Sequence, residues 1–253
     1  MSLRIGWYTT RGRSSRAMFE AVRDAIAADT LDAEIAYVFS NRDPGEDPVT
    51  DAFFDLVRTE GIPLLTLSSV AYRKAHGGER SRTGEPLPAW REAFDTEVAR
   101  LVDQHPADLG VLAGYMLIFT AGFTEAHPLV NLHPALPGGP IGTYVEVIRE
   151  LIRTHATESG VMLNVAIPEV DMGPVVAYSR YALPAGALPV DASDEAIEAS
   201  PLFEEIRALQ VAHESPFLVA ALQAFATGRV SLDASTALDL TEDVATRLTA
   251  ARA

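Results

Sequence analysis

The chain has 253 residues, no cysteine and a formal net charge of −15, from 20 Lys and Arg against 35 Asp and Glu. Without cysteine there are no disulfides, no thiolate metal sites and no cysteine nucleophile. The acidity repels phosphate backbones and anionic lipid, so we expect neither nucleic acid nor a membrane as partner. No run approaches the roughly 18 apolar residues of a membrane span, and the N-terminus lacks a signal-peptide pattern, so we expect a cytoplasmic protein acting on small molecules.

The first half alternates short apolar runs with amphipathic segments, a pattern typical of parallel βαβ units. It predicts a strand at 3–8, a helix capped by Ser14 or Ser15, a strand at 33–40, a helix at 51–61 and a strand at 62–67. The polar, glycine-rich residues 71–88 predict a mobile surface loop. A helix over about 89–105, a strand within 109–119, a short helix and a strand at 129–134 complete this half.

The second half begins with the helical pattern "TYVEVIRELIRTH", whose inward residues would be Val145, Ile148, Leu151 and Ile152. Two alternating stretches around "PEVDMGP" then predict an antiparallel strand pair. Residues 194–225 are helical in spacing, with breaks expected at Pro201 and Pro216. The fold class is therefore α/β, a mostly parallel twisted sheet flanked by helices with an antiparallel C-terminal extension. We expect one domain over 1–232 and a loosely attached helical tail over 233–253.

The loop after the first strand, "TTRGRSSRA", is one place where a ligand could bind, because open parallel sheets bind ligands beyond the carboxyl ends of their strands. Gly12, Arg13 and Ser14 supply backbone access, charge and a hydroxyl, which suits a phosphate. The pattern is neither a Walker loop nor G-x-G-x-x-G, and a solvated turn before a helix explains it about equally well.

A second candidate site follows the strand that ends in "NLHPALPGGPIG". Asn131 and His133 are two residues apart on extended backbone, so their side chains project to the same side. An amide and an imidazole could then address one small group, or Asn131 could cap a turn while His133 satisfies a carbonyl. Asp171, in "PEVDMGP", could fold back toward His133. The other histidines lack metal-ligand spacing, and we expect no metal.

The motifs "VFSNR", "VLAGYM", "NLHPALP" and "EVDMGP", in this order, resemble the glycinamide ribonucleotide formyltransferase family of purine synthesis. The resemblance extends from about Leu3 to Leu232. It implies a Rossmann-like formyltransferase fold and 10-formyltetrahydrofolate as co-substrate. It also implies that Asn131, His133 and Asp171 are catalytic.

In the implied chemistry, Asn131 donates to the formyl oxygen, and protonated His133 stabilises the oxyanion of the tetrahedral species. Asp171 helps to remove the proton of the attacking amine, directly or through water. The resemblance places Gly12, Arg13 and Ser14 at the substrate phosphate. Folate contacts would come from Met116, Leu117, Ile118, Phe119, Val165 and Glu169.

Four departures from the family pattern bear on the acceptor. Leu117 replaces an arginine, Asn164 replaces a second histidine, "RGRSS" replaces "GNGSN", and the segment after His133 is shorter. The alternatives are a formyltransferase for another small amine, such as an amino-sugar nucleotide, a formyltetrahydrofolate hydrolase, or a non-catalytic folate- or nucleotide-binding protein. Transfer to initiator tRNA is disfavoured by the acidity. A monomer and a homodimer are both compatible with the sequence.

Overall fold

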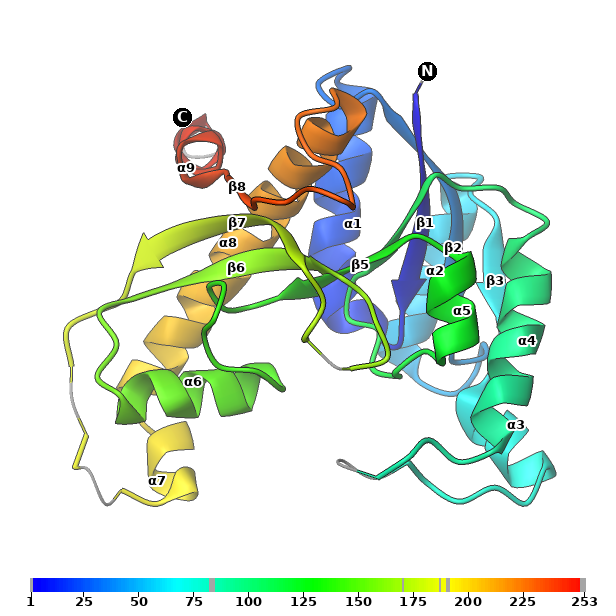
Figure 1. Ribbon diagram of the computed structural model, residues 1–253, viewed down its shortest axis with the longest axis horizontal. Coiled ribbons are helices and arrows are strands. Elements are labelled where there is room, and N and C mark those ends of the chain that lie inside the picture. The colour runs from blue at the N-terminus through cyan, green and yellow to red at the C-terminus, as the bar shows by residue number, and fades with distance from the viewer. Residues whose placement is uncertain (1, 82–84, 170, 187, 190–191, 251–253) are drawn as a thin grey trace. The chain divides into compact units, whose positions relative to one another are not determined.

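A computed structural model describes residues 2–81, 85–169, 171–186, 188–189 and 192–250, with backbone only for 12–14 (Figure 1). The chain forms two compact units. The first contains residues 1–131 and 166–172, and the second contains residues 132–165 and 173–253. The chain thus passes from one unit to the other more than once.

The first unit contains parallel strands joined by helices. Its elements are β1 (Leu3–Thr9), α1 (Gly12–Ala27), β2 (Ala33–Ser40), α2 (Pro48–Thr59), β3 (Leu64–Thr66), α3 (Ser69–Ala75), α4 (Trp90–Val102), β4 (Leu109–Leu112), α5 (Ala121–Ala126) and the start of β5 (Leu129–His133). The strand order is β3-β2-β1-β4-β5, and every pair is parallel. The predicted parallel sheet is confirmed.

Aromatic side chains fill the core of the first unit on both faces of its strands. On one face, Trp7 meets the edge of Phe19, and Phe19 meets the edge of Phe53, with centroids 5.6 and 5.3 Å apart. On the other, Tyr8 lies among Tyr37, Phe39, Phe119 and Phe123. Edge-to-face contacts of this kind add to the stabilisation that burial of aromatic area supplies.

A glycine in β1 leaves room for a tyrosine ring from the neighbouring strand in this core. A Cβ atom at Gly6 would clash with the ring of Tyr37, its register partner in β2. The Tyr37 hydroxyl lies 2.6 Å from that of Tyr8, and its burial raises the pKa of Tyr37 to about 12. Both hydroxyls are therefore satisfied within the core.

The second unit contains an antiparallel pair and the longest helix. Its elements are α6 (Tyr144–Arg153), β6 (Glu158–Val165), β7 (Val175–Ala182), α7 (Asp194–Glu198), α8 (Pro201–Ala226), β8 (Leu238–Asp239) and α9 (Thr241–Ala250). β6 and β7 are antiparallel, as predicted, and β8 runs parallel to β7. The α/β class with a mostly parallel sheet and antiparallel strands near the C-terminus is thus confirmed.

Helix α6 begins with a complete capping box and buries one face. Thr143 accepts from the Glu146 amide, and Glu146 accepts from the Thr143 amide at 2.7 Å. The predicted inward residues Ile148, Leu151 and Ile152 are buried, whereas Val145 is only half-buried and Val147 takes its place. These residues pack against Phe203 and Ile206 of α8.

Four predicted boundaries are wrong. Helix α1 begins at Gly12 with Arg11 as its N-cap, and Ser15 lies inside the helix, where it accepts from the Trp7 indole at 2.8 Å. Helix α2 begins at Pro48, because Asp47 caps it. Part of the predicted loop 71–88 is helical, since Ser68 caps α3. Pro216 lies inside α8 and does not break it, although Pro201 does start that helix.

None of the helices that the structure describes is both long enough and apolar enough to cross a bilayer. The tail predicted at 233–253 contains β8 and α9. Leu240 and Val244 are buried there, and the tail contacts α8 and β7. The division into a domain over 1–232 and a tail remains a prediction.

Candidate functional site

The loops after β1 and β4 meet at the carboxyl ends of the parallel strands. The strand order reverses between these two strands, and open α/β sheets bind ligands at such a point. The Thr10 amide donates to the Gly114 carbonyl at 3.1 Å, and the Met116 amide donates to Thr10 Oγ1 at 2.7 Å. Residues 116–119, predicted to bind folate, therefore begin beside the end of β1.

Helix α4 holds this segment through a buried ion pair. Arg91 donates to the Ile118 carbonyl, and the Thr120 amide donates to Asp95 Oδ2 at 2.7 Å. The Arg91 NH2 and Asp95 Oδ1 atoms are 3.5 Å apart, and the two side chains are 1% and 2% exposed. Burial raises the pKa of Asp95, and the positive charge of Arg91 opposes that shift.

Sequence reasoning missed this pair. The signal was present in "REAFD", because opposite charges four residues apart lie on the same face of a helix.

Two of the four predicted folate residues in this segment expose their side chains. Met116 is 66% exposed and Ile118 is 36% exposed, whereas Leu117 is half-buried. Phe119 is buried and stacks between Tyr115 and Phe123, with centroids 4.7 and 4.0 Å away. Phe119 therefore anchors the segment in the core, while the side chains of Met116 and Ile118 face solvent.

Asn131 and Asp171 lie together in the first unit, as the predicted site requires. The Asn131 Nδ2 group donates to Asp171 Oδ1 at 2.9 Å across a sequence separation of 40 residues. Asp171 has a φ of 57°, in the left-handed region that aspartate adopts more readily than most residues. The turn also contains a bond from the Met172 amide to the carbonyl of Glu169, whose side chain is exposed. The hydrogen bond to Asp171 fixes the orientation of the Asn131 amide.

His133 belongs to the second unit, and it is 2% exposed. Its Nε2 atom lies 2.8 Å from the Pro140 carbonyl. Because a carbonyl oxygen can only accept, Nε2 carries the hydrogen of this bond. The carbonyl contact anticipated for His133 is thus present, and it orients the ring.

The remaining predicted residues are placed as follows. Residues 12–14 begin α1, but their side chains lie outside the described part of the structure, so the predicted phosphate contacts remain a prediction. The Val165 amide donates to the Pro174 carbonyl at 2.8 Å. Asn164, which replaces a family histidine, is 1% exposed and donates to the Val165 carbonyl at 3.4 Å.

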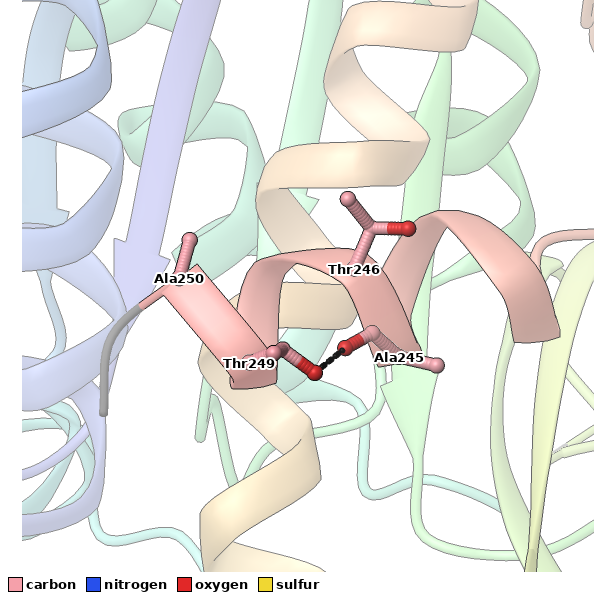
Figure 2. A pocket seen from close by; sticks show the side chains of 4 residues that line it. All are labelled: Ala245, Thr246, Thr249 and Ala250. Carbon is pink, nitrogen blue, oxygen red and sulfur yellow. Dashed lines mark hydrogen bonds between the residues drawn. The ribbon is translucent and has the colours of Figure 1, made fainter. Parts of the chain in front are cut away.

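The surface has two depressions, one on helix α9 and one beside the segment that follows His133. Figure 2 shows one on α9, lined by Ala245, Thr246, Thr249 and Ala250, where Thr249 donates to the Ala245 carbonyl at 2.9 Å. No lining side chain there titrates near neutral pH, so it offers little for catalysis. The other, of about 340 Å³, lies beside the segment after His133 and is lined by Pro140, Ile141, Glu146, Arg149, Glu150 and Arg153.

Among the residues that the structure describes, no three His, Asp or Glu side chains are grouped closely enough to hold a metal ion.

The parallel α/β sheet thus carries, at the carboxyl end of β5, an amide that is hydrogen-bonded to a carboxylate, and open α/β sheets of this class bind their ligands at that edge. The chain belongs to the formyl transferase family, whose sequence model matches residues 13–187, more than half of its length.

Two curated relatives are phosphoribosylglycinamide formyltransferases. The Dictyostelium discoideum enzyme is 29% identical over 62% of this chain and 74% of its own. The Escherichia coli enzyme is 28% identical over 66% of this chain and 68% of its own. The family is therefore identified by sequence as well as by the arrangement of strands.

Solved structures share the fold at lower identity. The phosphoribosylglycinamide formyltransferase of Coxiella burnetii is 20% identical, covers 94% of this chain and 99% of its own, and has a TM-score of 0.64. A formyltetrahydrofolate deformylase of Pseudomonas syringae is 20% identical, covers 90% of this chain and 63% of its own, and has a TM-score of 0.62. The same fold thus occurs in proteins named for transfer and for hydrolysis.

Proposed function

We propose that this enzyme transfers the formyl group of 10-formyltetrahydrofolate to the amine of glycinamide ribonucleotide, a step of purine synthesis. The observation that carries the proposal is the Asn131–Asp171 hydrogen bond, in a chain of the formyl transferase family. Curated relatives named for this activity support the choice of acceptor.

The proposed reaction forms one bond and breaks one. The amine nitrogen attacks the formyl carbon, the carbonyl oxygen becomes an oxyanion, and the bond to the folate nitrogen then breaks. The amine loses one proton, and the folate nitrogen gains one. Asn131 Nδ2 carries two hydrogens, so it can donate to Asp171 and to the oxyanion together.

In this scheme Asp171 accepts the proton of the amine, directly or through water, and His133 delivers a proton to the leaving nitrogen.

The folate side of the site would be formed by apolar side chains of the first unit. Met116, Ile118 and Met172 are exposed, at 66%, 36% and 65%. Flat aromatic ligands bind apolar surfaces of this kind, with polar backbone groups fixing their orientation. Val165 and Glu169 are the remaining folate contacts that we propose.

The acceptor phosphate would bind at the N-terminus of α1, where residues 12–14 begin a helix and backbone amides favour an anion. A net charge of −15 repels an anionic substrate elsewhere, so Arg13 should be needed locally. We expect Arg13→Ala to raise the KM of the ribonucleotide about 10-fold or more and to leave the folate KM unchanged. Initial rates at varied concentrations of each substrate measure this. An unchanged acceptor KM would favour an unphosphorylated amine.

One assay distinguishes the candidate functions. Purified protein is incubated with 10-formyltetrahydrofolate and glycinamide ribonucleotide, with an amino-sugar nucleotide, or with no amine, while folate absorbance, formate and formylated product are measured. The proposal expects formylated glycinamide ribonucleotide and little formate. Formate without amine would indicate a hydrolase, product only with the sugar nucleotide would change the acceptor, and folate binding without turnover would indicate a binding protein.

We also propose that the enzyme acts in the cytoplasm, as a monomer or homodimer, on small molecules and not on nucleic acid. The strong negative charge supports the last point. Light scattering measures the oligomeric state.

A further inference from the structure

The segment of residues 134–143 joins His133 to helix α6 and holds the carbonyl that orients its ring. It contains Pro134, Pro137 and Pro140, and it ends at the Thr143 cap of α6. Because the His133 Nε2 hydrogen is directed to the Pro140 carbonyl at 2.8 Å, any displacement of this segment displaces the ring's partner. What holds the segment therefore bears on His133.

Helix α8 holds the first end of the segment through Gln210. This side chain is 1% exposed, and its Nε2 group donates to the Pro134 carbonyl at 3.3 Å. Its Oε1 atom accepts from Arg207 at 3.3 Å. A flipped amide would put oxygen against the Pro134 carbonyl and nitrogen against the guanidinium, so Arg207 fixes the orientation in which Gln210 can donate.

The same guanidinium holds the other end of the segment. Its central carbon lies 4.1 Å from the centre of the Tyr144 ring, the first residue of α6 after the cap. A cation over an aromatic face at this distance is attractive, and the planar guanidinium can also stack. Arg207 thus connects, through Gln210 and Tyr144, both ends of the segment that carries Pro140.

A buried carboxylate orients the guanidinium. Glu214, one turn beyond Gln210 on α8, accepts from Arg207 NH1 at 3.1 Å, and its side chain is 10% exposed. A carboxylate that is this buried requires a charged partner, so it confines Arg207 to the position from which it reaches Tyr144.

We propose that Arg207, Gln210 and Tyr144 are positioning residues for His133, which set its ring by fixing the segment 134–143. The inference rests on the proposed function in assigning His133 to the reaction. It adds residues of α8 and α6 that act through the segment and do not contact the reacting atoms.

The first test is a pair of variants at Tyr144. Because this side chain is 44% exposed, its substitution should preserve folding. Tyr144→Leu removes the aromatic face, whereas Tyr144→Phe keeps it. We expect Tyr144→Leu to lower kcat about 10-fold with both KM values within about twofold, because misplacement of a catalytic group affects the chemical step. Tyr144→Phe should retain the activity.

Arg207→Met is the second variant, with Arg180→Met as its matched control. Arg180 lies over the Tyr178 ring at 5.4 Å in the same unit, and its hydrogen bonds and ion pairs within the described residues are with Tyr178, Thr241, Glu158 and Asp239, all outside the segment. We expect kcat to fall about 10- to 100-fold in Arg207→Met and to stay unchanged in Arg180→Met. A folded Arg207→Met or Tyr144→Leu protein with normal kcat would overturn the proposal.

A spectroscopic readout separates this proposal from the proposed function. With ¹⁵N-labelled histidine, the His133 Nε2–H signal, assigned by its loss in His133→Gln, should shift in Arg207→Met and in Tyr144→Leu but not in Arg180→Met. The shift is expected even if no amine is formylated. An unchanged signal in both variants would overturn the positioning role, whereas a shift without any transferase activity in the wild type would overturn only the proposed function.

Discussion

At the scale of single residues, His133 is the side chain whose removal should affect chemistry and not binding. We expect His133→Ala to lower kcat by roughly 100-fold or more, because the imidazole acts on charge that develops in the transition state. The dissociation constant of the folate, measured by fluorescence titration, should change little.

The control for this variant is His76→Ala, since His76 is an exposed residue that stacks on Tyr72. Near-normal turnover in His133→Ala, with the control also active, would remove His133 from the reaction.

Glu214 should make stability depend on pH. Burial raises its pKa in the folded state, and Arg207 only partly offsets this. Below the unfolded pKa, near 4.3, the group is protonated in both states and costs nothing, and above the folded pKa the cost of the buried charge is complete. Stability from this group is therefore lost as pH rises.

We expect the difference in Tm, Glu214→Gln minus wild type, to become more positive between pH 4 and pH 7. Thermal unfolding of both proteins across this range measures it. A difference that moves the other way would show that the Arg207 charge outweighs the desolvation of the carboxylate.

At the scale of elements, α4 stabilises the segment at 116–120 through the buried Arg91–Asp95 ion pair, and removal of either partner should be strongly destabilising. Asp95→Leu leaves the Arg91 charge buried without its partner, which costs about 3–5 kcal/mol. It also removes the acceptor of the Thr120 amide, so the folate KM should rise. Urea unfolding and initial rates measure the two effects.

Asp95→Asn is the matched control, because its Oδ1 atom can still accept from Thr120. Its folate KM should stay closer to that of the wild type even though stability falls. Equal folate KM values in Asp95→Leu and the wild type would show that α4 does not position the folate segment.

Helix α8 carries a proline that its sequence pattern suggested would end it. Pro216 has no amide hydrogen and cannot bond to the carbonyl four residues earlier, a loss of about 3 kcal/mol in a helix interior. Pro216→Ala should therefore raise the free energy of unfolding, by roughly 1–3 kcal/mol. Urea unfolding measures it, and a decrease would mean that the native helix requires the bend.

The helix survives this proline because tertiary packing outweighs local propensity. Phe217, Leu218, Val219 and Leu222, which follow the proline, are all buried. The same reason explains α3, which falls in a stretch that looked like a loop. The ring centroids of Tyr72 in α3 and Phe94 in α4 are 5.3 Å apart, and the polarity and glycine content of the stretch could not indicate this contact.

At the scale of the whole molecule, periodicity predicted the parallel strands and the antiparallel pair but not β8, which lies in the stretch predicted as a helical tail. The strand predicted at 33–40 matches β2 residue for residue, because hydrophobic runs between turn signals are local information. Periodicity could not decide which distant loops meet.

The site was therefore less predictable than the fold. The bond from Asn131 to Asp171 joins strand β5 to a turn 40 residues later, and the sequence pattern indicated only that Asp171 could fold back toward His133. Arg207, Gln210 and Glu214 have the i, i+3, i+7 spacing of one helix face, but this pattern could not show that the face meets Pro134 and Tyr144.

The interleaved path of the chain has a consequence for its synthesis. The first unit consists of residues 1–131 together with 166–172. During translation, most of this unit is therefore synthesised before residues 166–172, which complete it. The Ala166 amide, which donates to the Leu129 carbonyl at 2.9 Å, emerges only after β6 has been translated. No single cut in the gene yields two whole units, and no circular permutation does so either, because the pieces of the two units alternate along the chain.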